Sequence, residues 1–86
     1  MAKIDYIRAF VLRGKIRRKV LIELTKGERT QVQIHQSTGV YRTHVRRALI
    51  ELQSKGLIKC LNPKDRIYKI YVITGFGKKI IKNTQS

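Results

Sequence analysis

Apolar residues recur at intervals of three or four positions in the first part of the chain, which is the spacing of one face of an α-helix. This pattern predicts a helix over residues 3–12 and a second helix over residues 15–24, with Gly14 allowing a bend between them. Lys26 and Gly27 then end the second helix, because helices favour a cation in the last turn and a glycine just beyond it. The apolar stripe consists of Ile4, Ile7 and Val11 in the first helix and of Ile16, Val20, Leu21 and Leu24 in the second.

Two more helical segments follow within residues 31–56. A short helix over residues 32–38 ends at Gly39, where glycine accepts the positive φ angle of a tight turn. A longer helix over residues 42–55 stops at Gly56. Two helices joined by such a turn form a helix-turn-helix motif, whose second helix enters the major groove in proteins that bind DNA. The apolar face of the longer helix consists of Val45, Ala48, Leu49 and Leu52.

After Gly56 the pattern changes from helix to strand. Residues 57–61 and 67–73 are rich in Leu, Ile, Tyr and Val and flank a turn over residues 62–66, so they predict a β-hairpin. Within the second strand, Tyr68 and Tyr71 alternate with isoleucines and are expected to pack in the sheet. Thr74 then predicts the N-cap of a final helix that ends near residue 82.

The order of these segments predicts a fold of the α+β class. Helix, helix, helix, hairpin and helix is the order of a winged helix-turn-helix domain, with three helices, a two- or three-stranded β-wing and a C-terminal helix. The sequence contains no internal repeat, low-complexity block or linker. We therefore expect a single domain over residues 1–86.

Charge indicates the kind of partner. The chain carries 20 Lys and Arg residues against 5 Asp and Glu residues, a formal net charge of +15 over 86 residues. A field of this sign attracts nucleic acid or an anionic membrane surface. No apolar run approaches a membrane span and no signal-peptide pattern is present, so we expect a cytoplasmic, nucleoid-associated protein. A single cysteine, Cys60, fits a reducing compartment, and an ordinary strand position is favoured for it over an intermolecular disulfide.

The sequence shows no catalytic or metal-binding pattern. Its five acidic residues are scattered, and it has neither a Ser-His-Asp arrangement nor a phosphate-binding loop. His35 and His44, with one distant cysteine, do not make a metal site. His35 is interpreted as a packed or surface residue, and His44 either contacts a phosphate or base or is an ordinary partly exposed side chain, with the ordinary case slightly favoured. We expect a protein that is not an enzyme, with no cofactor and no evident small-molecule effector.

The outward side of the 42–55 helix is basic and supplies the candidate DNA contacts. Arg46 and Arg47 are expected at base edges, where Arg can bind guanine O6 and N7, and Arg42 at a phosphate. Ile50 also lies outward, and contact with a neighbouring segment is favoured over contact with a thymine methyl group. The candidate set is Tyr41, Arg42, Thr43, His44, Arg46 and Arg47 on the helix, Lys64 and Arg66 on the wing, and Gln31, Arg17 and Arg18 in supporting positions, although a solvated helix face is the favoured interpretation of the last two.

Four sequence segments match a known pattern: residues 12–21, residues 37–40, residues 48–58 apart from 53 and 54, and residues 71–77. Through them the chain resembles small archaeal and bacterial winged helix-turn-helix transcription regulators of the MarR and ArsR superfamily, over about residues 11–82. The resemblance implies that residues 41–47 enter the major groove and that residues 64–66 form the wing. The wing cations Lys64 and Arg66 are expected on the minor groove or on phosphates. Tyr41 departs from the pattern, because relatives place a capping Ser, Thr or Asp there. Its hydroxyl contacting a phosphate and its ring packing at the helix entrance are equally favoured.

We therefore expect a sequence-specific protein that binds double-stranded DNA and regulates transcription. Other classes stay open: a non-specific chromatin or architectural protein, an RNA-binding winged helix, and a protein-protein module, which the basic outward face disfavours. A homodimer is also expected, and the alternative is that the apolar stripe only completes the core of one chain. The expected dimer interface consists of Ile4, Ile7, Val11, Ile80 and Ile81.

Overall fold

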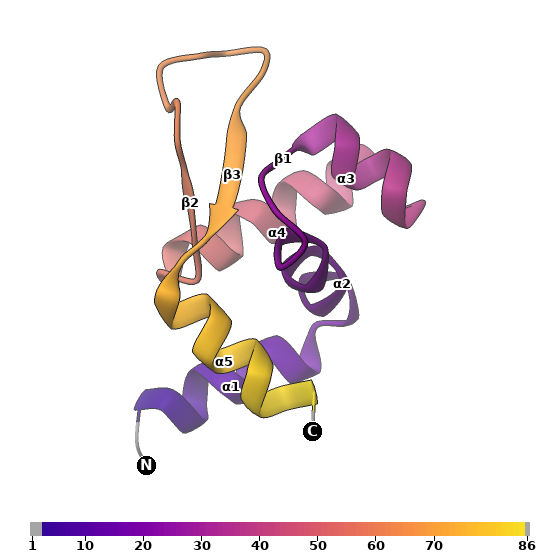
Figure 1. Ribbon diagram of the computed structural model, residues 1–86. Helices are drawn as coiled ribbons and strands as arrows, with labels where there is room; N and C mark the ends of the chain where they lie inside the picture. The colour runs from indigo at the N-terminus through magenta and orange to yellow at the C-terminus, as the bar shows by residue number, and fades with distance from the viewer. Residues whose placement is uncertain (1–2, 86) are drawn as a thin grey trace.

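The computed structural model describes residues 3–85, and the side chains of residues 3–82. Over this range, the helices pack together and one small sheet lies against them, with its β2–β3 hairpin projecting outward (Figure 1). In chain order the elements are α1 (Lys3–Arg13), α2 (Lys15–Leu24), β1 (Arg29–Thr30), α3 (Gln31–Thr38), α4 (Arg42–Ser54), β2 (Ile58–Cys60), β3 (Ile70–Ile73) and α5 (Gly75–Gln85).

The α+β winged helix-turn-helix class is confirmed, and the four helical segments predicted before the hairpin are all present, one more than the three helices named for this fold. Gly14 adopts an extended conformation, with φ of −100° and ψ of 98°, which separates α1 from α2 and leaves four helices ahead of the hairpin. Figure 1 shows α1 and α5 side by side at the end of the molecule opposite the β2–β3 loop. Helix α2 packs against α4 and joins this end to the helix-turn-helix.

The sheet has three antiparallel strands in the order β1-β3-β2. The outer strand β1 pairs Arg29 with Tyr71 and Thr30 with Ile70. Strand β1 was not predicted, because two residues are too few to show strand alternation. Its effect is to join the start of the helix-turn-helix to the wing.

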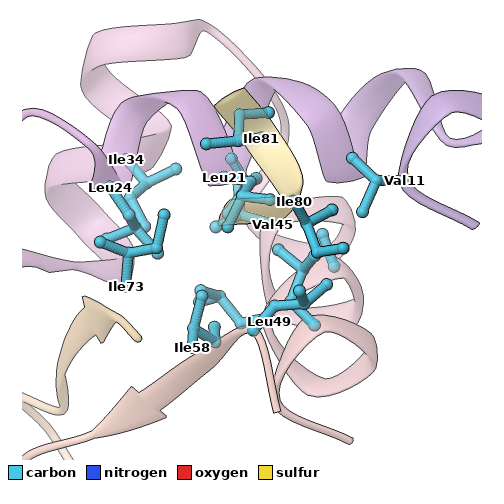
Figure 2. Packing of buried hydrophobic residues seen from close by; sticks show 14 of the residues in the cluster. Val11, Leu21, Leu24, Ile34, Val45, Leu49, Ile58, Ile73, Ile80 and Ile81 are labelled. Atoms are coloured by element: carbon cyan, nitrogen blue, oxygen red, sulfur yellow. The ribbon is translucent and has the colours of Figure 1, made fainter. Parts of the chain in front are cut away.

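One hydrophobic core unites the helices and the sheet. Figure 2 shows Leu49 from α4 and Ile58 from β2 in the same cluster as Ile80 and Ile81 from α5. Burial of each such side chain contributes about 1.5–3 kcal/mol. The fully buried large residues are Leu21, Leu24, Ile34, Leu49, Leu52, Leu57, Ile58, Ile80, Val11, Val20 and Val45.

The proposed dimer interface is wrong, because its residues complete this core. Ile7, Val11, Ile80 and Ile81 are 0–3% exposed, and Ile4 packs half-buried against them. Helices α1 and α5 therefore cover each other's apolar faces within one chain. An apolar stripe on a terminal helix looks the same in sequence whether its partner helix belongs to the same chain or to another copy.

The hairpin strands are shorter than the sequence predicted. Strand β3 begins at Ile70 rather than at residue 67, so Tyr68 lies in the connecting loop and is 67% exposed. The expectation that Tyr68 packs in the sheet is therefore wrong, whereas Tyr71 does pack against the core. Cys60 is a half-buried residue of β2, as expected.

Thr74 and Gly77 fix the junction between the wing and α5. The Thr74 hydroxyl accepts a hydrogen bond from Gly77 N–H at 3.0 Å, which confirms the predicted N-cap. Its backbone N–H donates to Leu57 O at 3.0 Å. A Cβ atom at Gly77 would collide with the carbonyl oxygen of Leu57, so only glycine lets the first turn of α5 approach the chain this closely.

Candidate nucleic-acid interface

The turn between α3 and α4 is fixed by glycine and by side-chain hydrogen bonds. Gly39 ends α3 with φ of 74°, the left-handed conformation predicted for it. His35 Nδ1 donates to Val40 O at 2.6 Å, so this histidine is a structural residue of the turn. Thr38 Oγ1 accepts from Val40 N–H at 3.2 Å. These bonds set the angle at which α4 leaves the turn.

The start of α3 carries a capping box that our sequence analysis missed. Thr30 Oγ1 accepts from Gln33 N–H at 3.2 Å, and Gln33 Oε1 accepts from Thr30 N–H at 2.9 Å. The pattern of Thr followed three residues later by Gln is its sequence signal. Beside it, Gln31 Nε2 donates to Arg42 O at 3.4 Å, which links the supporting position at Gln31 to the first turn of α4.

Helix α4 begins at Arg42 without a side-chain cap, as the poor capping residue Tyr41 predicts. The Tyr41 side chain is 73% exposed, so the interpretation that it packs at the helix entrance is wrong. Its ring centroid lies 6.1 Å from that of His44, which is also exposed. The two rings together extend the polar surface at the start of α4.

The outward face of α4 is cationic and accessible to solvent. Arg42, Thr43, Arg46 and Arg47 are all exposed beside His44. Ile50 is 58% exposed on this face. A hollow of about 270 Å³ on this face is lined by Thr43, Arg46, Arg47, Ile50 and Glu51.

The positive charge on the outward face of α4 is not neutralised by ion pairs with acidic side chains. Among the described side chains, carboxylates pair with Arg8, Arg17 and Lys26 and with no cation on the outward face of α4. A surface that combines several exposed arginines with no acidic partner attracts phosphate groups over a distance of about 10 Å at 0.1 M salt.

Arg17 was expected to face solvent, and this expectation is wrong. Its guanidinium group binds both carboxylate oxygens of Glu51 on α4, at 3.3 and 3.1 Å, and donates to Phe10 O at 2.8 Å. It also lies 3.9 Å from the centroid of the Phe10 ring, a cation–π contact. Arg17 therefore ties α1, α2 and α4 together, whereas its neighbour Arg18 is exposed as expected.

The wing supplies a second cationic surface. Lys64 and Arg66 are exposed in the loop between β2 and β3, which projects beyond the sheet in Figure 1. A groove of about 430 Å³ separates this loop from the starts of α3 and α4. Its lining includes Gln31 and Arg42 on one side and Arg66, Tyr68 and Lys69 on the other.

Burial and hydrogen bonding shift two acid-base equilibria at the wing. Backbone N–H donors of Tyr68 and Ile67 lower the pKa of Asp65, which is therefore ionised at neutral pH. Burial raises the pKa of the Tyr71 hydroxyl, the nearby Cys60 raises it further, and Arg46 opposes both. Arg46 is therefore close enough to β3 for its positive charge to act on the Tyr71 hydroxyl.

Metal-binding groups and membrane-spanning helices are absent from the described residues. They contain no group of three or more His, Cys, Asp or Glu side chains that could hold a metal ion. No helix among them is long and apolar enough to cross a membrane.

Comparison with solved structures shows which known proteins share this arrangement of helices and wing. A MarR family transcription regulator is 29% identical in sequence, covers 91% of this chain and superposes with a TM-score of 0.74. The chain has the winged helix-turn-helix fold of MarR regulators. The MarR fold is shared with a possible transcriptional regulatory protein from Mycobacterium bovis, at 24% identity, 95% coverage of this chain and a TM-score of 0.77. It is shared also with a variant of Lactococcus lactis ZitR in complex with DNA, at 21% identity, 81% coverage and a TM-score of 0.69.

These MarR-fold proteins differ from the chain in length. The chain spans 58% of the MarR family regulator and 49% of ZitR, but 87% of the Mycobacterium bovis fragment. No protein-family model matches the sequence, and no curated protein sequence matches it. The common part is thus the helix-turn-helix with its wing and the helices that pack against it.

Proposed function

We propose that the chain binds double-stranded DNA in a sequence-specific manner and regulates transcription. One observation carries this proposal: the exposed face of α4 concentrates arginines that have no acidic partner, in the position of a recognition helix. The MarR fold supports it, since the similar proteins are transcription regulators and one of them, ZitR, was solved in complex with DNA. The chain acts by binding rather than by catalysis.

The residues divide into two roles. Arg46 and Arg47 lie on the middle of the outward face of α4 and read base edges in the major groove. Arg42 and the wing cation Arg66 line the groove between α4 and the wing loop, and Lys64 is exposed on the same loop. These three cations hold phosphates, which position the protein without specifying sequence. Thr43, His44 and Tyr41 extend the surface at the start of the helix.

Selection of bound duplexes from a random DNA pool tests the proposal. At physiological salt and with an RNA competitor present, we expect enrichment of one motif. Equal recovery of all duplexes would instead establish a non-specific architectural protein, and loss of DNA to the competitor would establish an RNA-binding winged helix. A palindromic motif would additionally indicate a dimer, with an interface outside the buried apolar stripe.

Three alanine variants test the division of roles on the selected duplex. Arg46→Ala should relax preference at one base position and weaken binding roughly tenfold. Lys64→Ala should weaken all duplexes alike and lower the salt slope by about one. Lys79→Ala removes the same charge from α5, the helix at the end of the molecule opposite the β2–β3 loop (Figure 1), and should change neither. Equal effects of all three variants would show that only net charge matters.

A further inference from the structure

The wing loop, residues 61–69, exposes apolar side chains at its tip. Ile67 is 78% exposed, more than any other large hydrophobic residue among the described side chains, and its neighbour Tyr68 is 67% exposed. Neither belongs to a strand or touches the core. Adjacent exposed apolar residues at the tip of a projecting loop mark a surface that binds something.

Hydrogen bonds hold these two residues in place. Asp65 Oδ1 accepts from the backbone N–H groups of Ile67 and Tyr68, at 2.9 and 2.8 Å. Asn62 Nδ2 donates to Tyr68 O at 2.7 Å, and Asn62 Oδ1 accepts from Ile70 N–H at 2.7 Å. The apolar tip is therefore presented in a defined conformation, which lowers the entropic cost of inserting it into a partner.

The surroundings of the tip indicate the partner. Lys64, Arg66 and Lys69 flank Ile67 and are exposed. The one acidic residue of the loop, Asp65, is occupied by backbone donors. An apolar tip surrounded by cations complements a partner with an anionic exterior and a stacked apolar interior, which describes a base step between two phosphate backbones.

The position of the tip relative to α4 favours the same DNA molecule as its partner. Ile67 and Tyr68 line the groove of about 430 Å³ whose opposite wall includes Arg42 at the start of α4. A duplex that receives α4 in its major groove would present its adjacent minor groove to this side of the loop.

We propose that Ile67 is an apolar wedge that enters the minor groove, partly unstacks one base step and bends the duplex. Lys64, Arg66 and Lys69 hold the flanking phosphates, and Tyr68 packs beside the wedge against the sugar. Inserted aliphatic side chains kink DNA by 20–90° in architectural proteins. This inference rests on the proposed DNA binding and adds to it a bend and a preference for deformable steps.

The test uses two duplexes of equal length and base composition that both carry the motif selected above, each labelled at both ends for energy transfer. One has TA steps at its centre, and the other has a rigid A-tract there. Because TA steps unstack readily, the wild-type chain should bind the TA duplex about tenfold more tightly and shorten its end-to-end distance. Ile67→Ser should abolish both the preference and the shortening.

Two further variants separate the wedge from charge and from folding. Ile67→Lys adds a cation at the tip, so it should bind both duplexes at least as tightly as the wild type and bend neither. Leu61→Ala removes an exposed side chain of the same size at the base of the loop and should retain the preference and the bend. Circular dichroism of all variants should be unchanged, because none of these side chains is buried.

The results of these binding and bending measurements distinguish failure of the wedge from failure of the proposed DNA binding. Binding of the wild type without shortening, or shortening that survives Ile67→Ser, overturns the wedge and leaves the proposed DNA binding intact. Absence of wild-type binding to either duplex overturns both proposals. Binding to anionic phosphatidylserine vesicles that Ile67→Ser abolishes, with duplex bending unaffected, would assign the tip to a membrane surface instead and overturn the wedge.

Discussion

Helix α4 rests on four buried side chains, Val45, Ala48, Leu49 and Leu52, whereas the wing loop contains no buried side chain at all. Both surfaces present exposed arginine or lysine to solvent. The hydrophobic core therefore fixes the first surface, while hydrogen bonds from Asn62 and Asp65 to the backbone fix the second. Substitutions in the wing loop should therefore have little effect on stability, whereas the recognition helix tolerates substitution only on its outward face.

Truncation of a core residue beneath α4 should have the largest effect. Leu49→Ala leaves a cavity at a position that is 1% exposed, so we expect a loss of about 2–5 kcal/mol in the free energy of unfolding. Leu61→Ala in the wing, where the side chain is 47% exposed, should change that free energy by less than about 0.5 kcal/mol. Urea denaturation followed by circular dichroism measures both. Similar losses for the two variants would show that the wing loop contributes as much to stability as the core beneath α4.

A buried carboxylate on α2 offers a second, pH-dependent test of the helical body. Ser37 Oγ donates to Glu23 Oε1 at 2.5 Å, and this hydrogen bond is the main reason that the pKa of Glu23 is lowered below 4.5. Lys26 lowers it further by a hydrogen bond and by its charge, against the opposing effect of burial. A lowered pKa in the folded state stabilises the fold above the unfolded pKa, and this contribution is lost as the pH falls through the folded value.

Ser37→Ala should therefore lose stability at neutral pH and lose less in acid. We expect a deficit of about 1.5 kcal/mol at pH 7, the lower end of the range for a hydrogen bond to a charged group, because Ser37 itself is exposed. The difference from the wild type should narrow below pH 4.5, where Glu23 takes up a proton in both proteins. Unfolding in urea at a series of pH values measures it. A deficit that is constant from pH 7 to pH 3 would show that Ser37 acts through packing and not through the Glu23 charge.

The contact between Arg17 and Glu51 tests how α4 is joined to the rest of the body. Their side chains are 25% and 34% exposed, so solvent screens the pair and a coupling of about 0.5–1 kcal/mol is expected. Arg17→Ala should cost more than Glu51→Ala, because Arg17 also binds Phe10 O and lies over the Phe10 ring. A double-mutant cycle with Arg17→Ala, Glu51→Ala and the double variant measures the coupling. A coupling near zero would mean that the core alone positions α4.

Much of the fold could be predicted, because the helices follow from apolar residues that recur with the period of a helix. The bounds of α2, the start of α4 at Arg42 and the left-handed turn at Gly39 follow from apolar spacing and glycine conformation, and the structure confirms them. The Thr74 cap was predicted in the same way from its position before an apolar helix. In each case the residues that determine the structure are neighbours in sequence.

The errors arise where the determining contact is distant in sequence. Arg17 was assigned to solvent because its partner Glu51 lies on another helix, and the stripe at Ile80 and Ile81 was assigned to a dimer because its partner is α1. At the wing, alternation of isoleucine and tyrosine favoured a strand. The backbone N–H groups of Ile67 and Tyr68 instead donate to Asp65 Oδ1, and the strand begins only at Ile70. The exposed cations of α4 and the wing were placed correctly on the surface, and their contacts with DNA stay a prediction.

The smallest effect on stability is expected for substitutions of Asp65. They test directly whether hydrogen bonds, rather than core packing, fix the wing loop. Asp65→Ala removes the acceptor for two backbone N–H groups of the loop, while Asp65→Asn keeps an oxygen acceptor and removes only the charge. Since the residue is exposed and touches no core side chain, the unfolding midpoint in urea should not move for either variant. Amide hydrogen exchange at Ile67 and Tyr68 should quicken in Asp65→Ala and stay close to wild type in Asp65→Asn.

The pH dependence of the same two amides tests whether the loop is held by the ionised carboxylate. The backbone donors lower the pKa of Asp65, so the hydrogen bonds are fully formed above its ordinary value of 3.8 and weaken as the pH falls through the lowered one. In the wild type, the NMR shifts of these amides should titrate below pH 3.8, whereas in Asp65→Asn they should not. If the amides of α4 titrated together with them, the wing and the recognition helix would form one cooperative unit. Their independence is what allows a hydrogen-bonded loop to change its contacts with a partner while the core beneath the recognition helix stays the same.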